Sequence, residues 1–365
     1  MRSLSLKSVL PIAFASILAC LAPLAMQAQS DKAHGILDQG VKVTGLTGAD
    51  AAPWHIKANY TFYDPMKGTE TESGTFEEWW SSPWTWHRVY TEKKLSGEEW
   101  STSHLKQFKR KDNKLDVVAL DQKVANPLTN PLLLAANYKP DVEMTGVAGL
   151  VEGEALNCVS ATSPAAHANG LNPDLLFPRF CLDIKDSTLR YTTTSTTMTA
   201  YSDFKPMGSR QVATKVAVKP YNKLAAALEI TQLEALPAGS DAQLAPAPKT
   251  IPQAWPHQPG DPALVPVKIT ECAYTMDART KQEVGMVYIP IVIQKNGSVK
   301  VNGYPSGPPD LASSASDCVS NWKFQPFMLD GEAVEVSDTA LYDFDGKPFK
   351  GSVVLVSQAP APAAK

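Results

Sequence analysis

The segment from Pro237 to Pro266 constrains the fold of this 365-residue chain more than any other feature, because it contains eight prolines. Proline lacks a backbone N–H and holds φ near about −65°, so such a dense run disfavours both helices and sheets. We expect a semi-rigid, extended connector without regular structure. The chain is then divided into two folding units, residues 33–236 and residues 267–350.

The N-terminus has the layout of a secretory signal peptide over residues 1–28. Arg2 and Lys7 precede an uncharged, apolar run from Val9 to Met26, and Ala28 offers a small residue for cleavage. Two alternatives stay open: an uncleaved membrane anchor, for which this run is short and contains prolines, and a lipoprotein site at Cys20. We therefore expect a periplasmic or secreted protein that is peripheral to a membrane at most.

Charge and motifs argue against several function classes. The 34 Lys and Arg residues are outnumbered by 37 Asp and Glu residues, and a net charge of −3 disfavours nucleic-acid binding. The sequence contains no P-loop, no HExxH motif, no serine nucleophile elbow and no dinucleotide-binding glycine pattern. We predict a non-enzymatic protein with no catalytic residues, no cofactor and no metal site.

Four cysteines lie beyond the expected signal peptide: Cys158, Cys181, Cys272 and Cys318. An even number in an oxidising compartment predicts disulfides. Three pairings are possible, and the division into two units favours one bond within each unit, Cys158–Cys181 and Cys272–Cys318. Four buried free thiols are the alternative.

The N-terminal unit has the texture of an antiparallel β-meander that follows a short amphipathic helix within residues 33–48. Runs of aromatic and β-branched residues recur about every ten residues, with turn residues between them. A short, alanine-rich helical segment at 126–137 is expected to cap the sheet. The Thr-rich run 192–199 suits a strand, although a solvated linker is the alternative. The expected strands are residues 54–62, 75–80, 84–91, 99–108, 142–150, 154–160, 179–184, 188–199, 211–219 and 223–233.

Six of the eight tryptophans lie between residues 54 and 100, which suggests an aromatic cavity for a hydrophobic ligand. Because side chains alternate along a strand, the adjacent Trp79 and Trp80 must point to opposite faces, so only one of them can line a given cavity. Ordinary core packing is the alternative. The cavity candidates are Trp54, Trp79, Trp86 and Trp100.

Three histidines of the same region, His55, His87 and His104, could meet across neighbouring strands. A catalytic or metal site would also need an orienting carboxylate, and nearby candidates exist. Nothing in the spacing requires such a site, and unrelated surface histidines are the alternative. The candidate carboxylates are Glu77, Glu78, Glu98 and Glu99.

The C-terminal unit begins with an alternating strand over residues 285–293, an Asn-Gly turn at Gly297 and a return strand from Val299. Residues 312–322 have apolar positions at helical spacing, which places Cys318 on the buried face. The turn Asp330-Gly331 then precedes a strand over residues 335–344. The predicted order is hairpin, helix, strand.

The motifs of this unit resemble a TonB C-terminal domain over about residues 268–346. The resemblance implies a small αβ fold with a three-stranded antiparallel sheet, one edge of which pairs with a segment of an outer-membrane receptor. Residues 334–344 are the candidate edge for such strand addition, with a dimer contact or plain solvent exposure as alternatives. Trp322 is expected to anchor the core. The residues that carry the resemblance are Gly285, Gly297, Trp322, Phe324, Pro326 and Gly331.

The order of elements in residues 33–236, with the run from Gly74 to Trp80 and the pair Trp86-x-Arg88, resembles periplasmic half-barrels of the LolA type. This resemblance implies a curved sheet whose apolar concave face holds an acyl chain.

Together these observations predict an α+β protein: a half-barrel-like antiparallel sheet with short helices, a proline-rich linker, a TonB-like domain and a disordered tail at 358–365. We expect a cell-envelope protein that binds an envelope or outer-membrane partner by strand addition, with a possible link to transport across that membrane. A periplasmic carrier of a lipid or lipoprotein acyl chain is the alternative.

Overall fold

The structure of the chain, a computed structural model, describes residues 29–48, 50–136, 143–161, 178–194, 196–256, 261–281, 285–305, 307–344 and 351–355. The expected signal peptide and the C-terminal tail lie outside these ranges. Among the described residues, no helix combines the length and the hydropathy that a membrane span requires.

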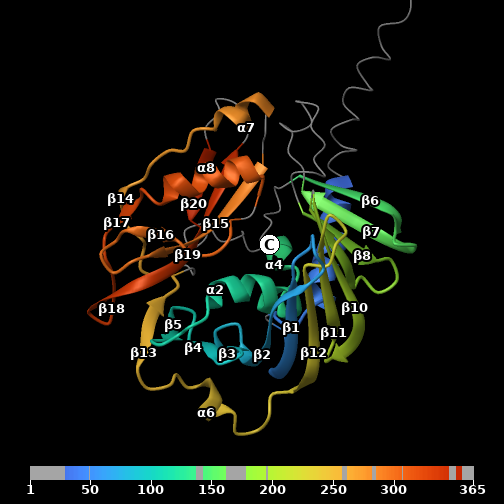
Figure 1. The fold of residues 1–365 in the computed structure, drawn as a ribbon, viewed down its shortest axis with the longest axis horizontal. Helices are drawn as coiled ribbons and strands as arrows, with labels where there is room; N and C mark the ends of the chain where they lie inside the picture. The colour runs from blue at the N-terminus through green and yellow to red at the C-terminus, as the bar shows by residue number, and fades with distance from the viewer. Residues whose placement is uncertain are drawn as a thin grey trace, which may run out of the picture.

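The N-terminal half is a curved antiparallel sheet of twelve strands, in the spatial order β6-β7-β8-β9-β10-β11-β12-β1-β2-β3-β4-β5 (Figure 1). The pairing of β1 with β12 joins the two ends of the meander. The strands are β1 Trp54–Tyr63, β2 Glu70–Ser82, β3 Thr85–Glu92, β4 Leu95–Ser101, β5 Lys106–Arg110, β6 Met144–Val151, β7 Glu154–Ala161, β8 Arg179–Asp183, β9 Leu189–Thr193, β10 Thr197–Met207, β11 Arg210–Pro220 and β12 Ala226–Ala235.

Helical segments cover one face of this sheet. A continuous run consists of α2 Val117–Leu120, the π-helical η1 Asp121–Ala125 and α3 Asn126–Thr129, followed by α4 Leu133–Ala136. Val117, Leu120, Val124 and Leu128 face the sheet and join Trp54, Trp80, Trp86 and Tyr90 in one core. Residues 29–43 form a further helix, which buries Ala33 and Leu37 in the same core. The helical segment predicted at residues 126–137 belongs to the longer run that starts at Val117.

Two predicted strands are in fact pairs of strands. Residues 99–108 divide into the end of β4 and most of β5, and residues 188–199 divide into β9 and the start of β10. One pair turns back within residues 102–105, and the other turns back after Thr194. These segments contain no Gly or Pro, the strongest turn signals, so the sequence pattern did not reveal the turns.

The C-terminal half contains α7 Met276–Lys281, β15 Gly285–Ile293, β16 Val299–Val301, α8 Pro309–Val319, β17 Lys323–Phe324, β18 Phe327–Leu329, β19 Glu332–Phe344 and β20 Gly351–Leu355. The strand order is β16-β15-β19-β20, all antiparallel, and α8 packs on β15 and β19. Leu311, Ala315, Val319 and Trp322 lie in its core. The α+β class predicted from the sequence is confirmed, with β20 added to the expected three-stranded sheet.

The proline-rich connector contains regular structure, contrary to the expectation. It forms α6 Asp241–Leu244, β13 Thr250–Ala254 and β14 Pro266–Lys268. β13 pairs antiparallel with β5 and parallel with β19, so it joins the N-terminal and C-terminal sheets (Figure 1). Trp255 N–H donates to the carbonyl oxygen of Leu105 at 3.0 Å.

The alternation of an antiparallel ladder explains how β13 tolerates a proline. Because Trp255 donates to β5, the N–H of Gln253 also points to β5, whereas position 252 points away. Pro252 therefore stands where β5 needs no donor. The rule that prolines break strands fails here because it depends on the direction of each N–H.

Candidate functional site

Four pairs of adjacent residues place a charged row and an aromatic row on opposite faces of strands β2 to β5. The pairs are Glu78-Trp79, His87-Arg88, Glu99-Trp100 and Phe108-Lys109. The register brings Glu78 opposite Arg88, Arg88 opposite Glu99, and Glu99 opposite Lys109. Since neighbouring residues point to opposite faces, the aromatic or histidine member of each pair follows the same path on the other face.

The charged row lies on the helix-covered face and alternates in sign. Arg88 Nε lies 2.9 Å from Glu78 Oε1, and Arg88 Nη1 lies 3.3 Å from Asp121 Oδ1, at the start of η1. Tyr90 also donates its hydroxyl to Asp121. The guanidinium carbon of Arg88 stacks 4.5 Å from the ring centroid of Trp86, so this one cation serves two carboxylates and an aromatic ring.

Desolvation raises the pKa values of two carboxyl groups in this row, Glu78 and Glu99. Glu78 is fully buried, which raises its pKa to about 7 against the opposing charge of Arg88. Desolvation, followed by the negative charge of Asp121, raises the pKa of Glu99 to about 8. The row therefore changes its charge near neutral pH. Its acidic and basic members face one another along the row, so the row forms a charge network.

The charged row continues into the C-terminal domain. Lys109 Nζ lies 2.8 Å from Glu335 Oε2 in β19, and Gln253 of β13 donates its amide to the same oxygen at 3.2 Å. A second, more exposed ion pair joins Lys106 to Asp330 at 2.7 Å. A half-buried ion pair, an exposed ion pair and the shared strand β13 therefore connect the two domains.

The aromatic row lies on the outer face. The ring centroids are 5.0 Å apart for His55 and Trp79, 5.1 Å for Trp79 and His87, and 4.4 Å for His87 and Trp100, and all three pairs are stacked. The connector helix α6 packs over β2 and β3 (Figure 1). Burial lowers the pKa of His87 to about 4, so this imidazole is neutral at neutral pH.

The three candidate histidines do not converge on one site. His55 contacts Glu77 and Glu234, each at 2.8 Å, while His87 lies 3.6 Å from Glu98. His104 pairs with Asp261 at 2.7 Å. His55 and His87 are buried, so they are not the surface histidines of the alternative either. Within the described ranges, no group of three or more His, Cys, Asp or Glu side chains could hold a metal.

The four cavity tryptophans lie on two different faces. Trp54 and Trp86 pack in the core under the helices, where Trp54 stacks on Trp80 at 5.6 Å. Trp79 and Trp100 belong to the outer row. A single cavity lined by all four is therefore wrong, because both faces of this part of the sheet are covered, one by helices and the other by α6.

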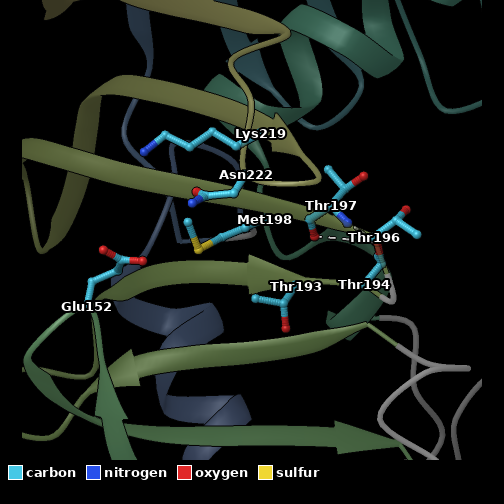
Figure 2. Close-up of a pocket in the computed structure, with 8 residues that line it drawn as sticks. All are labelled: Glu152, Thr193, Thr194, Thr196, Thr197, Met198, Lys219 and Asn222. Atoms are coloured by element: carbon cyan, nitrogen blue, oxygen red, sulfur yellow. Dashed lines mark hydrogen bonds between the residues drawn. The ribbon is translucent and has the colours of Figure 1, made fainter. Parts of the chain in front are cut away.

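Two pockets stand out among the described residues, and neither resembles an acyl-chain cavity. The larger, about 250 Å³, lies beside the β9–β10 turn, and Figure 2 shows its threonines together with Glu152, Lys219 and Met198. The smaller, about 60 Å³, lies between Trp54, Met207 and Arg210. Side chains from α2, η1 and α3 fill the space over the sheet that a lipid would need.

The C-terminal signature residues have structural roles. Gly297 has φ +80°, and a Cβ there would lie 1.8 Å from the carbonyl oxygen of Phe324, so only glycine fits. Trp322 is buried and donates its indole N–H to the carbonyl oxygen of Thr270 at 3.1 Å. Phe324 is also buried, while Pro326 is exposed. Gly285 starts β15, and Gly331 lies in the β18–β19 turn.

The expected open edge at residues 334–344 is not open. β19 pairs with β15 along one side, and with β20 and β13 along the other. The prediction missed β20, which lies beyond the last motif residue, and β13, which lies in the connector. Sequence spacing cannot show that distant segments fill an edge.

The cysteines follow the prediction in part. Cys158 and Cys181 are directly opposite each other on β7 and β8 and form a disulfide. Cys272 and Cys318 are free thiols in the structure, contrary to the second predicted bond. Burial is the main cause of the raised pKa of Cys272, and the neighbouring thiol of Cys318 raises it further.

Sequence reasoning missed Arg88, Asp121, Lys109 and Glu335 as members of one network. It did identify Glu78 and Glu99, but as possible partners of histidines on the other face. The recurrence of a charged residue beside an aromatic residue or histidine in four successive strands was the available signal. It would have predicted two rows on opposite faces.

Residues 270–345 match the family described as Gram-negative bacterial TonB protein C-terminal. The C-terminal domain is therefore similar to TonB C-terminal domains, and it is called the TonB-type domain below. The match covers α7, β15, β16, α8 and β17 to β19, and it ends before β20. The sequence matches no curated protein.

Solved structures show a more distant similarity. A LolA superfamily protein from Nitrosomonas europaea is 9% identical, with TM-score 0.38 and coverage of 59% of this chain and 97% of that one. A DUF1329 family protein from Desulfovibrio piger is also 9% identical, with TM-score 0.39 and coverage of 60% and 97%. The complex structure of Pseudomonas aeruginosa MucA/MucB is 12% identical, with TM-score 0.28 and coverage of 88% of this chain and 94% of that one. None of these three TM-scores reaches 0.5, so the functions of these proteins do not transfer to this chain.

Proposed function

We propose that this chain is a non-enzymatic cell-envelope protein whose TonB-type domain binds an extended segment of an envelope or outer-membrane protein by strand addition. The observation that carries the proposal is the family match over residues 270–345, in a domain built around an antiparallel sheet. Extended peptides bind such sheets through main-chain hydrogen bonds along an unpaired edge. Export by the N-terminal segment would bring the domain to the compartment of such partners.

The docking edge in this proposal is β20 rather than residues 334–344. Among the described strands, β20 pairs only with β19, so its second edge has no strand beside it. Its five residues, Gly-Ser-Val-Val-Leu, are uncharged and rich in β-branched side chains, which suits pairing with an added strand. The opposite edge strand, β16, has only three residues and offers a shorter ladder.

The N-terminal domain has a supporting role in this proposal. The strand β13 and the ion pair Lys109–Glu335 attach this domain to β19, which is the neighbour of the docking strand β20. Such attachment would hold the docking edge in a fixed orientation relative to the half-barrel. The carrier alternative gains no support from the two pockets described above, so strand addition is the function that we propose.

Site-specific photo-crosslinking in cells tests the proposal. A photoreactive amino acid is placed at Ser352 or, in a second variant, at Val353 of β20. We expect crosslinks to one envelope protein from both positions and none from Thr231, an exposed control position in β12. A synthetic peptide from the crosslinked segment should then protect β20 amides from hydrogen exchange. Crosslinks of equal yield from Thr231, or no protection of β20, would contradict strand addition here.

A further inference from the structure

The edge of the N-terminal sheet at β6 has an unusual surface. Residues Val147 to Leu150 are all exposed, with Val147 at 64% and Leu150 at 76% of their possible solvent exposure. The strand, Met-Thr-Gly-Val-Ala-Gly-Leu-Val, carries no charge. Among the described strands it pairs only with β7. Edge strands normally carry charges, prolines or a covering segment that prevent pairing with another chain, and β6 itself has no charge or proline.

The register of the β6–β7 hairpin shows which amides face outward. Val151 pairs with Glu154 across the two-residue turn Glu152-Gly153, where both φ angles are positive. In such a turn the closing pair is hydrogen-bonded, so alternate residues back along β6 direct their N–H groups away from β7. Met144 is one of these, and its N–H donates to Ser30 Oγ at 3.0 Å. Ala148 and Leu150 are the exposed members of the same set.

The platform beneath this edge is reinforced. The disulfide Cys158–Cys181 joins β7 to β8 at directly opposite positions, and Leu156 packs against it. β7, the strand that carries β6, is therefore bonded covalently to β8. In Figure 1 the hairpin lies at the far side of the sheet from the C-terminal domain, so it is separate from the β20 edge.

Charge selects the occupant of the edge. Glu143 precedes β6, and Glu152 and Glu154 follow it, while the sequence from Pro140 to Pro178 contains no Lys or Arg. An antiparallel second copy would place these acidic ends beside each other, which is unfavourable. A foreign strand with basic ends would instead meet opposite charge at both ends.

We propose that β6 is a second docking edge, which binds an extended, β-branched segment of another protein with Lys or Arg at both ends. The added strand pairs with the outward N–H and C=O groups of Ala148 and Leu150 and covers Val147 and Leu150. This inference is independent of the proposed function, because it rests on a different sheet edge.

The test uses the mature chain and an eight-residue peptide of alternating threonine and valine with lysine at both ends. We expect saturable binding by fluorescence anisotropy, with hydrogen-exchange protection of Ala148 and Leu150. The same peptide with glutamate at both ends should bind about tenfold more weakly, and added salt should reduce the difference.

Proline variants supply the decisive comparison. Ala148→Pro removes one outward N–H without removing a β6–β7 hydrogen bond, so it should weaken the lysine-ended peptide about tenfold. Ala148→Thr, the matched control, keeps the N–H and should stay within about twofold. Leu150→Pro serves the same purpose if Ala148→Pro fails to fold.

Several results would overturn the proposal. These are no binding of the lysine-ended peptide at millimolar concentration, equal affinity of Ala148→Pro and Ala148→Thr, or protection confined to β20. Protection of Ala148 that grows with protein concentration in the absence of peptide would assign the edge to a second copy instead. Failure of crosslinking at β20 leaves this result unaffected, so the two proposals are separable.

Discussion

At the residue scale, Arg88 is the group on which the buried charges depend most. Its side chain is only 13% exposed and neutralises Glu78 and Asp121 while it stacks on Trp86. A buried carboxylate without a partner is strongly destabilising, whereas an exposed ion pair contributes little. The same chemical change should therefore have very different effects in the core and on the surface.

Arg88→Met should lower the free energy of unfolding by about 3–5 kcal/mol, because it leaves the buried Glu78 carboxyl group and the half-buried Asp121 without their cation. The matched control is Lys215→Met, which breaks an exposed pair with Asp203 and should cost less than about 1 kcal/mol. Urea denaturation of both variants measures the difference. Equal effects of the two substitutions would show that the row is not a buried network.

The raised pKa of Glu78 predicts a specific pH dependence. Folding raises this pKa from 4.5 to about 7, so the native state holds a proton that the unfolded chain releases over this range. Relative to Glu78→Gln, the wild type should therefore lose stability as pH increases from 4.5 to about 7, because Glu99 and His87 titrate in both proteins. Denaturation at several pH values checks it, with the exposed Glu229→Gln expected to follow the wild type.

His87 should have the opposite effect. Its pKa falls from 6.5 to about 4 on folding, so the unfolded chain binds a proton that the native state does not. Relative to His87→Phe, which keeps an aromatic ring in the stack, the wild type should lose stability as pH falls from 6.5 to about 4. A constant difference between the two proteins across this range would contradict a neutral, buried imidazole.

At the scale of single elements, β13 decides how the two halves are joined. It supplies one edge to β5 and the other to β19, within a segment whose composition predicted only a connector. α6 of the same segment covers the aromatic row. The connector is therefore part of the folded structure because it fills an open edge and covers apolar rings, and both effects offset its poor intrinsic propensity.

Gln253→Pro should loosen β13, because the N–H that points to β5 is lost. We expect cleavage by trypsin after Lys249, which is exposed next to β13, to become at least about fivefold faster. Ala247→Pro is the control, since it lies between α6 and β13 outside any strand. A cleavage rate that is unchanged in Gln253→Pro would mean that the β5–β13 pairing contributes little to local stability.

At the scale of the whole molecule, the half-barrel is filled by its own chain. The helices from Val117 to Thr129 occupy the concave side, and α6 lies on the other. The sheet is thus buried on both faces where the tryptophans cluster, which explains why the adjacent Trp79 and Trp80 both pack against other groups.

Native mass spectrometry of the gently purified mature chain should therefore give the protein mass with no added lipid. The physical reason is that helix side chains pack over the sheet in one core, and the two pockets described above measure only about 250 Å³ and about 60 Å³. The spectrum after denaturation is the internal control. An extra mass that is released on unfolding and matches a lipid would support the carrier alternative.

The sequence by itself determined the local features of this protein. Alternation located most strands, the Asn-Gly and Asp-Gly turns set the hairpins around Gly297 and Gly331, and helical spacing located α8. The motif around Trp322 identified the TonB-type domain, because that motif describes contacts within one compact unit. Cys158–Cys181 followed from the division of the chain into two units.

Only the tertiary structure decided which strands are edges, which carboxylates meet Arg88, and where the connector lies. Alternation with a period of two assigns a residue to a face but does not say which strand becomes its neighbour. Glu335 is more than 220 positions from Lys109, and β13 and β20 reach β19 from outside its motif. Such contacts depend on how segments distant in sequence fill shared edges and faces, which only the folded chain determines.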